Sequence, residues 1–116
     1  MNHNQRVGRW GEQQAALYLG QRGYDIAARN VRTPYGEIDL IVGKDGLTVF
    51  VEVKTRLSDS ADPPEVAVTG RKQSRMTACA EYYAQEHGLD HWRIDVIAVQ
   101  RIAGQTEVHH FENAVA

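Results

Sequence analysis

The chain has few or none of the sequence features that mark secreted or membrane-spanning proteins. Cys79 is its one cysteine among 116 residues, so no disulfide can form within the chain, and a disulfide-stapled secreted scaffold is excluded. No apolar run approaches the roughly 20 residues that span a bilayer. The opening MNHNQRVGRW also lacks the apolar stretch of a secretory signal. We therefore expect a soluble, cytoplasmic protein with no membrane partner.

Net charge is also small, at −2 with a pI of about 6.2. Proteins that coat nucleic acid through bulk charge are usually basic, so that mode of binding is disfavoured. The charge is unevenly distributed, however. Residues 1–33 carry five arginines against two acidic residues, whereas residues 76–116 carry two arginines against six acidic residues. A one-sided basic face therefore stays open.

The composition that is present is ordinary globular usage, with 42% hydrophobic and 24% charged residues. At this length we expect a flexible N-terminus over 1–6 and one domain over 7–116. The pattern predicts helices at about 7–22 and 69–87. It predicts strands at 24–29, 37–42, 47–54, 92–99 and 106–111, with a turn at 33–36 and a polar loop at 57–65. This order predicts an α/β (α+β) fold in which helices flank a mixed central sheet.

The strands 37–42 and 47–54 predict a hairpin, because Asp45-Gly46 between two apolar runs favours a two-residue turn. That turn makes paired positions sum to 91. Ile38 then faces Val53, Leu40 faces Val51 and Val42 faces Val49, all on one apolar face. The opposite face pairs Glu37 with Lys54, Asp39 with Glu52 and Ile41 with Phe50. This clean separation of faces supports the register.

One pair in this register is unfavourable, because Asp39 and Glu52 would lie about 5 Å apart and repel. A divalent cation, the ammonium of Lys54, or both would compensate. Two carboxylates with water and phosphate oxygens form a common Mg²⁺ site, and Mn²⁺ accepts the same ligands. The chemistry indicated is metal-assisted phosphodiester hydrolysis. The alternative is a solvated face with a Glu37–Lys54 ion pair and a tolerated repulsion.

Two further groups of residues could serve such a site. Glu12 shares a helix face with Ala15, Ala16 and Leu19, so it is either a third carboxylate for the metal or a charge near the helix N-terminus. The basic residues of the second helix either contact phosphate or form a solvated first turn in which Lys72 snorkels. Asp95, inside a strand, is interpreted as structural. The nucleic-acid-binding candidates are Arg9, Arg56, Arg71, Lys72 and Arg75.

Four segments together resemble the YraN-like family of uncharacterised bacterial proteins: GRWGEQQAALYL at 8–19, GEIDLI at 36–41, FVEVKTR at 50–56 and RIDVIAV at 93–99. That family resembles the restriction-endonuclease-like PD-(D/E)xK nucleases, close to Holliday junction resolvases. The resemblance implies an αβββαβ core, Asp39 and Glu52 as metal ligands, and Lys54 as the catalytic lysine. It places Glu12 where the resolvases carry a glutamate in their first helix. Ile38 stands where the motif has proline.

Three functions remain in contention from the sequence. The first is a Mg²⁺- or Mn²⁺-dependent nuclease acting on nucleic acid, with DNA as the expected polymer and a homodimer needed for duplex cleavage. The second is a nucleic-acid-binding module without turnover. The third is an assembly factor on a nuclease scaffold, for which the acidic C-terminal third argues.

Overall fold

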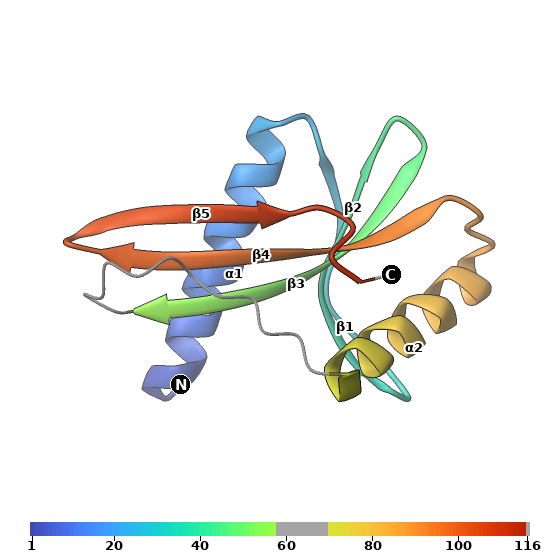
Figure 1. Ribbon diagram of the computed structural model, residues 1–116, viewed down its shortest axis with the longest axis horizontal. Helices are drawn as coiled ribbons and strands as arrows, with labels where there is room; N and C mark the ends of the chain where they lie inside the picture. The colour runs from blue at the N-terminus through green and yellow to red at the C-terminus, as the bar shows by residue number, and fades with distance from the viewer. Residues whose placement is uncertain (58–69, 116) are drawn as a thin grey trace.

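Five strands form one mixed sheet, and two helices cover its opposite faces (Figure 1). The computed structural model describes residues 1–57 and 70–115. The helices are α1 (His3–Gln21) and α2 (Gly70–His87). The strands are β1 (Asp25–Thr33), β2 (Gly36–Lys44), β3 (Leu47–Leu57), β4 (Trp92–Ile102) and β5 (Gln105–Phe111). The order along the chain confirms the expected αβββαβ arrangement followed by a further strand, and it is consistent with a restriction-endonuclease-like core.

The sheet follows the chain, with the order β1-β2-β3-β4-β5. Neighbouring strands run antiparallel, except that β3 and β4 are parallel. Parallel neighbours need a crossover connection, and α2 lies in the segment between them. The crossover puts α2 on the face of the sheet opposite to α1.

Each face of the sheet has its own apolar cluster. The α1-side cluster joins Ala15, Ala16 and Leu19 to alternate residues of β2, β3 and β4. The α2-side cluster joins Met76, Cys79, Ala80 and Ala84 to the residues between them, such as Phe50. Because β2, β3 and β4 are covered on both sides, they read as nearly continuous apolar runs.

The hairpin register is confirmed at three positions, where Leu40 pairs with Val51, Ile41 with Phe50 and Val42 with Val49. Asp45 and Gly46 have φ values of 53° and 81°, as a two-residue hairpin turn requires. Regular pairing of β2 with β3 runs no further than Leu40 and Val51. Beyond it, the Val53 backbone N–H donates to Asp39 Oδ2 at 2.8 Å. A side chain therefore takes a hydrogen bond that the ladder would otherwise make.

Ile38 does not share a face with Leu40 and Val42, and this part of the predicted register is wrong. It packs in the α2-side cluster together with Ile41, and their pairing partners Val31 and Ala28 pack there too. Between Ala28 and Val31 in β1, Asn30 has a φ of 52°. A left-handed residue breaks the two-residue alternation of a strand. The paired segment of β2 shows the same interruption between Ile38 and Ile41.

Helix α1 begins earlier than the pattern indicated, at His3. The Asn2 side chain accepts from the Gln5 backbone N–H at 2.9 Å, and the Gln5 side chain accepts from the Asn2 N–H at 3.1 Å. This capping box provides partners for two N–H groups that a helix start leaves unsatisfied. Likewise, β1 extends to Thr33 instead of ending near residue 29. The predicted loop beyond Leu57 and the predicted helix start at 69 lie outside the described residues.

No helix in the described part of the chain is both long enough and apolar enough to cross a membrane.

Candidate functional site

The site lies where β2 and β3 stop pairing, beside two carboxylates. Burial, and then the charge of Glu52, raises the pKa of Asp39 from its ordinary value of 3.8 to about 7. The hydrogen bond from Val53 opposes this rise. The charges of Asp39 and Glu52 therefore interact, although regular pairing of β2 with β3 ends one residue short of the predicted Asp39–Glu52 pair. At neutral pH the Asp39 carboxyl is divided between its protonated and ionised forms.

Cations reach this pair from the α2 side. Arg75 Nη2 lies 3.8 Å from Glu52 Oε1, which is a long ion pair between a half-exposed guanidinium and a mostly buried carboxylate. Lys54 follows two residues after Glu52 and interacts with it. The Lys72 side chain, hydrogen-bonded to Lys54, lowers the pKa of Lys54, and burial lowers it further. The structure thus brings Glu52, Lys72 and Arg75 together around Lys54.

Glu12 lies on the α1 side of the site, in a cluster of its own. The Asn30 amide nitrogen, turned toward the surrounding carboxylates, lies 3.2 Å from both Glu12 oxygens and 3.0 Å from Glu37 Oε1. Burial, and then the charge of Glu37, raises the pKa of Glu12. Glu12 and Glu37 also raise the pKa of Asp39, but less than Glu52 does. Glu37 therefore faces Glu12 and Asn30, which replaces the Glu37–Lys54 ion pair of the alternative interpretation.

Of the three predicted metal ligands, Asp39 and Glu52 fit a divalent cation better as a pair than all three do together with Glu12. Within residues 1–57 and 70–115, no three His, Cys, Asp or Glu side chains are placed to hold a metal ion. Asp39 and Glu52 supply the hard oxygen donors that Mg²⁺ and Mn²⁺ accept, and their mutual repulsion is what a cation would relieve. The two carboxylates therefore suit a cation completed by water and phosphate oxygens, with Glu12 outside the first pair.

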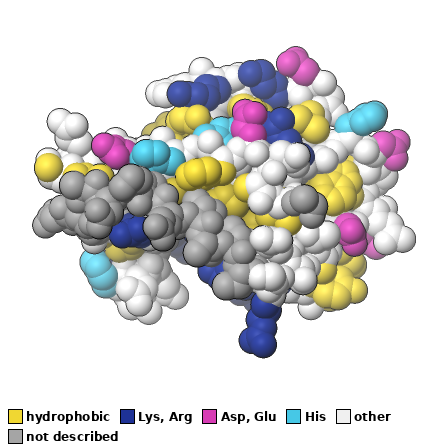
Figure 2. All heavy atoms as spheres, viewed as in Figure 1, with side chains coloured by type: hydrophobic (Ala, Val, Ile, Leu, Met, Phe, Trp, Pro, Cys, Tyr) yellow, Lys and Arg dark blue, Asp and Glu magenta, His cyan; other side chains and the backbone are white. Residues whose placement is uncertain are grey.

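The remaining basic candidates are spread over several elements. Arg71 is exposed in the first turn of α2, and Arg56 is exposed near the end of β3. Arg9 is exposed on α1. On the face shown in Figure 2, the coloured basic and acidic side chains are interspersed. Binding through a local group of cations therefore fits better than binding through a uniformly basic face.

Sequence reasoning did not identify Asn30 or Glu37 as parts of the site. Asn30 carried a signal, because asparagine is unfavourable inside a strand and tolerates left-handed backbone. Glu37 carried none beyond its nearness to Asp39. Its neighbours come from α1 and β1, far from it in the sequence.

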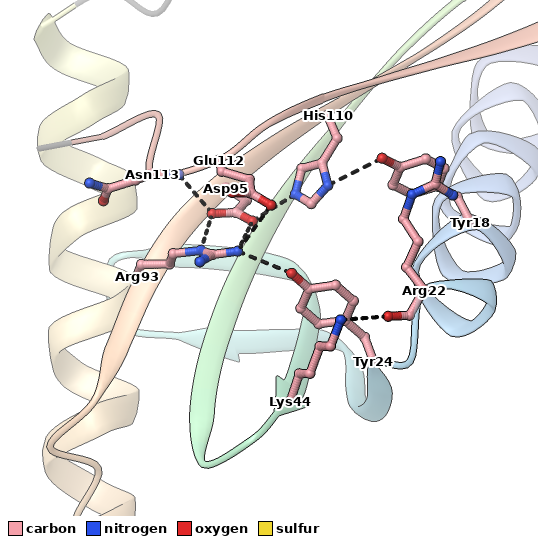
Figure 3. Close-up of polar contacts among 9 residues, drawn as sticks. All are labelled: Tyr18, Arg22, Tyr24, Lys44, Arg93, Asp95, His110, Glu112 and Asn113. Atoms are coloured by element: carbon pink, nitrogen blue, oxygen red, sulfur yellow. Dashed lines mark hydrogen bonds and ion pairs between the residues drawn. The ribbon is translucent and has the colours of Figure 1, made fainter.

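Asp95 belongs to a separate polar network at the other end of α1 (Figure 3). Its carboxylate is fully buried and accepts from Arg93 Nε at 2.9 Å and from the Asn113 backbone N–H at 2.9 Å. His110 Nε2 lies 2.7 Å from its other oxygen. Burial opposes the charge, but the hydrogen bonds from His110 and Arg93 outweigh it and hold the pKa of Asp95 below its usual value. These contacts join β4 to β5, which fits the structural role predicted for Asp95.

Comparison with known proteins places the chain in a family. The model of the uncharacterised protein family UPF0102 matches residues 11–99, which include Glu12, Asp39, Glu52 and Lys54. A UPF0102 protein of Syntrophotalea carbinolica is 44% identical over 110 residues, covering 93% of this chain and 89% of its own. One of Syntrophomonas wolfei is 41% identical over 113 residues, covering 96% and 98%. One of Rhodococcus jostii is 41% identical over 118 residues, covering 98% and 99%. The match over most of the chain and these near full-length relatives show that it belongs to the UPF0102 family.

Proposed function

We propose that this protein is a metal-dependent nuclease that hydrolyses phosphodiester bonds of nucleic acid, with DNA as the polymer expected. One observation carries the proposal. Asp39 and Glu52 lie close enough for their charges to interact, and after burial the charge of Glu52 is the largest cause that raises the pKa of Asp39 to about 7. Two carboxylates held this close without an offsetting role would destabilise the fold. A bound cation would offset the repulsion between the two carboxylates.

The carboxylates would hold Mg²⁺ or Mn²⁺, which supplies Lewis acidity toward a phosphate oxygen and lowers the pKa of a bound water. Lys54 lies beside Glu52, with a pKa lowered chiefly by Lys72. An ammonium of lowered pKa gives up its proton more readily than an ordinary lysine and is suited to orient the attacking water. Its remaining charge offsets the negative charge that develops on the phosphate.

Arg75 has a role on the substrate side. Its contact with Glu52 is long, at 3.8 Å, and half of its side chain is exposed. An exposed pair of this kind contributes little to stability. Arg75 is therefore free to turn to a phosphate once Glu52 has a cation as its partner. Arg71, one turn earlier on α2, extends the same basic surface along the backbone of a bound strand.

The test is cleavage of labelled single-stranded, duplex, flapped and four-way-junction DNA in Mg²⁺, Mn²⁺ or EDTA. Glu52→Gln and Lys54→Met should each reduce cleavage by about 100-fold or more, since each removes a charge needed at the reacting phosphate. Glu86→Gln, at an exposed position of α2, is the matched control and should cut like the wild type. All variants are purified identically, so that a contaminating nuclease would show equal cutting by every sample.

Cleavage that needs the metal and disappears in Glu52→Gln establishes the function. Equal cutting by the wild type and Glu52→Gln, or none by either, would instead favour a nucleic-acid-binding or assembly module without turnover. One chain offers one site, so duplex cleavage would further require a homodimer. Light scattering of the protein with and without the cut substrate reports that state directly.

A further inference from the structure

A polar cavity opens beside the site, between the first half of α1 and the strands β1 and β2. Its volume is about 510 Å³, and it is lined by Gln5, Gly8, Arg9, Glu12, Asn30, Arg32 and Glu37. The four α1 residues are spaced i, i+3, i+4 and i+7, so they form one face of the helix. The cavity therefore results from packing α1 across the hairpin β1–β2.

The cavity has a cationic side. Among the described residues, neither Arg9 nor Arg32 has a carboxylate within 4.0 Å. Both guanidiniums thus keep their donors for a ligand, and guanidinium binds phosphate in a two-pronged geometry. A Cβ placed on Gly8 would meet nothing within 4 Å, so a ligand can approach the helix backbone there.

The cavity also carries hydrogen-bond acceptors beside these cations, since Arg32 pairs with Glu37 and the charge of Arg9 acts on Glu12. Glu12 and Glu37 turn their oxygens toward the Asn30 amide nitrogen, which lies 3.0–3.2 Å from them and bridges the two carboxylates. Carboxylates repel phosphate but accept from the N–H groups of a base or the O–H groups of a sugar. A ligand that carries both an anionic group and hydrogen-bond donors would match this mixed lining, and a nucleotide carries both.

The cavity also lies near the reacting centre, because Glu37, which lines it, stands two residues before Asp39 on β2. Glu12 and Glu37 line the cavity and, through their charges, raise the pKa of Asp39. Its volume lies in the range of small-ligand sites, which holds one nucleotide but not a double helix. A nucleic-acid strand lying across Asp39 and Glu52 would have to separate from its complementary strand before one of its nucleotides could enter the cavity.

We propose that this cavity binds one unpaired nucleotide of the substrate strand, next to the phosphodiester that is cut. Arg9 and Arg32 take the phosphate, and the Glu12–Asn30–Glu37 side takes the donors of the base or sugar. This inference rests on the proposed function for the identity of the strand as substrate. It adds that the substrate has a single-stranded flank, as in a flap, an overhang or a free single strand.

The test is binding without cleavage, measured in EDTA by fluorescence anisotropy. The probes are a labelled 12-nucleotide single strand and the same strand as a blunt duplex. Arg9→Gln removes one phosphate contact, and Gly8→Leu fills the cavity while favouring the helix. Each should weaken single-strand binding by about 5- to 10-fold, comparable to the loss of one ordinary hydrogen bond, and change duplex binding by less than 2-fold. Arg6→Gln and Gly20→Leu are the matched controls on α1, since neither residue lines the cavity, and both should bind like the wild type.

The two proposals fail in different ways. Wild-type protein that binds no single strand, variants that bind like the wild type, or equal losses on both probes would overturn the cavity assignment, even if metal-dependent cleavage is found. Weakened single-strand binding by both variants, with no cleavage in any metal, would keep the cavity as a nucleotide site and reject the nuclease. Amide NMR of Gly8 during titration with the single strand provides a second readout, in which an unmoved signal also rejects the cavity.

Discussion

Asp39 and Asp95 show how neighbours decide the charge of a buried carboxyl. Asp95 is fully buried yet has a lowered pKa, because Arg93, His110 and the Asn113 N–H all donate to it. Asp39 receives one backbone N–H and lies beside Glu52, so its pKa is raised. A carboxyl whose pKa is lowered by folding stabilises the folded state at pH values above its unfolded-state pKa, and this stabilisation is lost in acid. A raised carboxyl pKa has the opposite consequence.

The raised pKa of Asp39 predicts a stability cost at neutral pH. The unfolded chain releases this proton near pH 3.8 and the folded chain near pH 7, so the folded state binds more protons between these values. Its free energy of unfolding should therefore fall as pH rises through that window. Asp39→Asn keeps an acceptor for the Val53 N–H and should stabilise the protein at pH 8 by on the order of 2 kcal/mol.

Thermal melts of the wild type and Asp39→Asn from pH 4 to pH 8 check this. The Tm difference should widen as pH rises. Adding Mg²⁺ or Mn²⁺ at pH 8 should reduce this Tm difference, because a cation that binds the folded wild-type protein raises its Tm. A difference that is constant with pH would show that the Asp39 carboxyl titrates normally.

At the scale of elements, the close approach of α1 to β3 holds Glu12 near the site. A Cβ on Gly11 would overlap the Thr55 side chain, so only glycine lets the helix lie this close. Gly11→Ala should destabilise the protein by about 1–3 kcal/mol through overpacking. It should also move the next residue, Glu12, away from Asn30. Urea unfolding measures the first effect.

Two further variants separate packing from helix propensity. Gly20→Ala adds a methyl group in the same helix, where nothing lies within 4 Å, and should be neutral or stabilising by up to about 1 kcal/mol. Thr55→Ala combined with Gly11→Ala should recover part of the lost stability, because the overlapping atoms are gone. Gly11→Ala protein as stable as the wild type would show that α1 can shift at little cost.

At the scale of the whole molecule, β2, β3 and β4 supply side chains to both apolar clusters. The two layers should therefore unfold together. Trp10 packs against the α1-side cluster and Trp92 against the α2-side cluster, so Trp92→Phe and Trp10→Phe leave one fluorescent probe in each layer. Their urea midpoints, each compared with the circular dichroism midpoint of the same variant, should coincide. A probe that changes before the helical signal would identify a layer that opens separately.

Much of the fold could be predicted from the chain, and the candidate site only in part. The turn at Asp45-Gly46 fixes the register of β2 with β3, because a two-residue turn allows one pairing. Continued one pair further, that pairing predicted the approach of Asp39 to Glu52, whose charges interact in the structure. It could not show that Ile38 turns to the α2 side, because the spacing within the hairpin contains no sign of the left-handed Asn30 in the neighbouring strand. A local pattern carries no information about a partner's irregularity.

The sequence by itself determined the element order, the hairpin and the carboxylate pair, because alternation, turn chemistry and helix periodicity act over a few neighbouring residues. Tertiary structure alone decided what surrounds that pair. From α2, Arg75 reaches Glu52 and Lys72 reaches Lys54, and Glu12 meets Glu37 through Asn30. It also decided the cavity between α1 and β1–β2. Such contacts depend on how closely whole elements pack. The close approach of Gly11 to Thr55 sets this packing distance for α1, and the spacing of residues along the sequence does not reveal it.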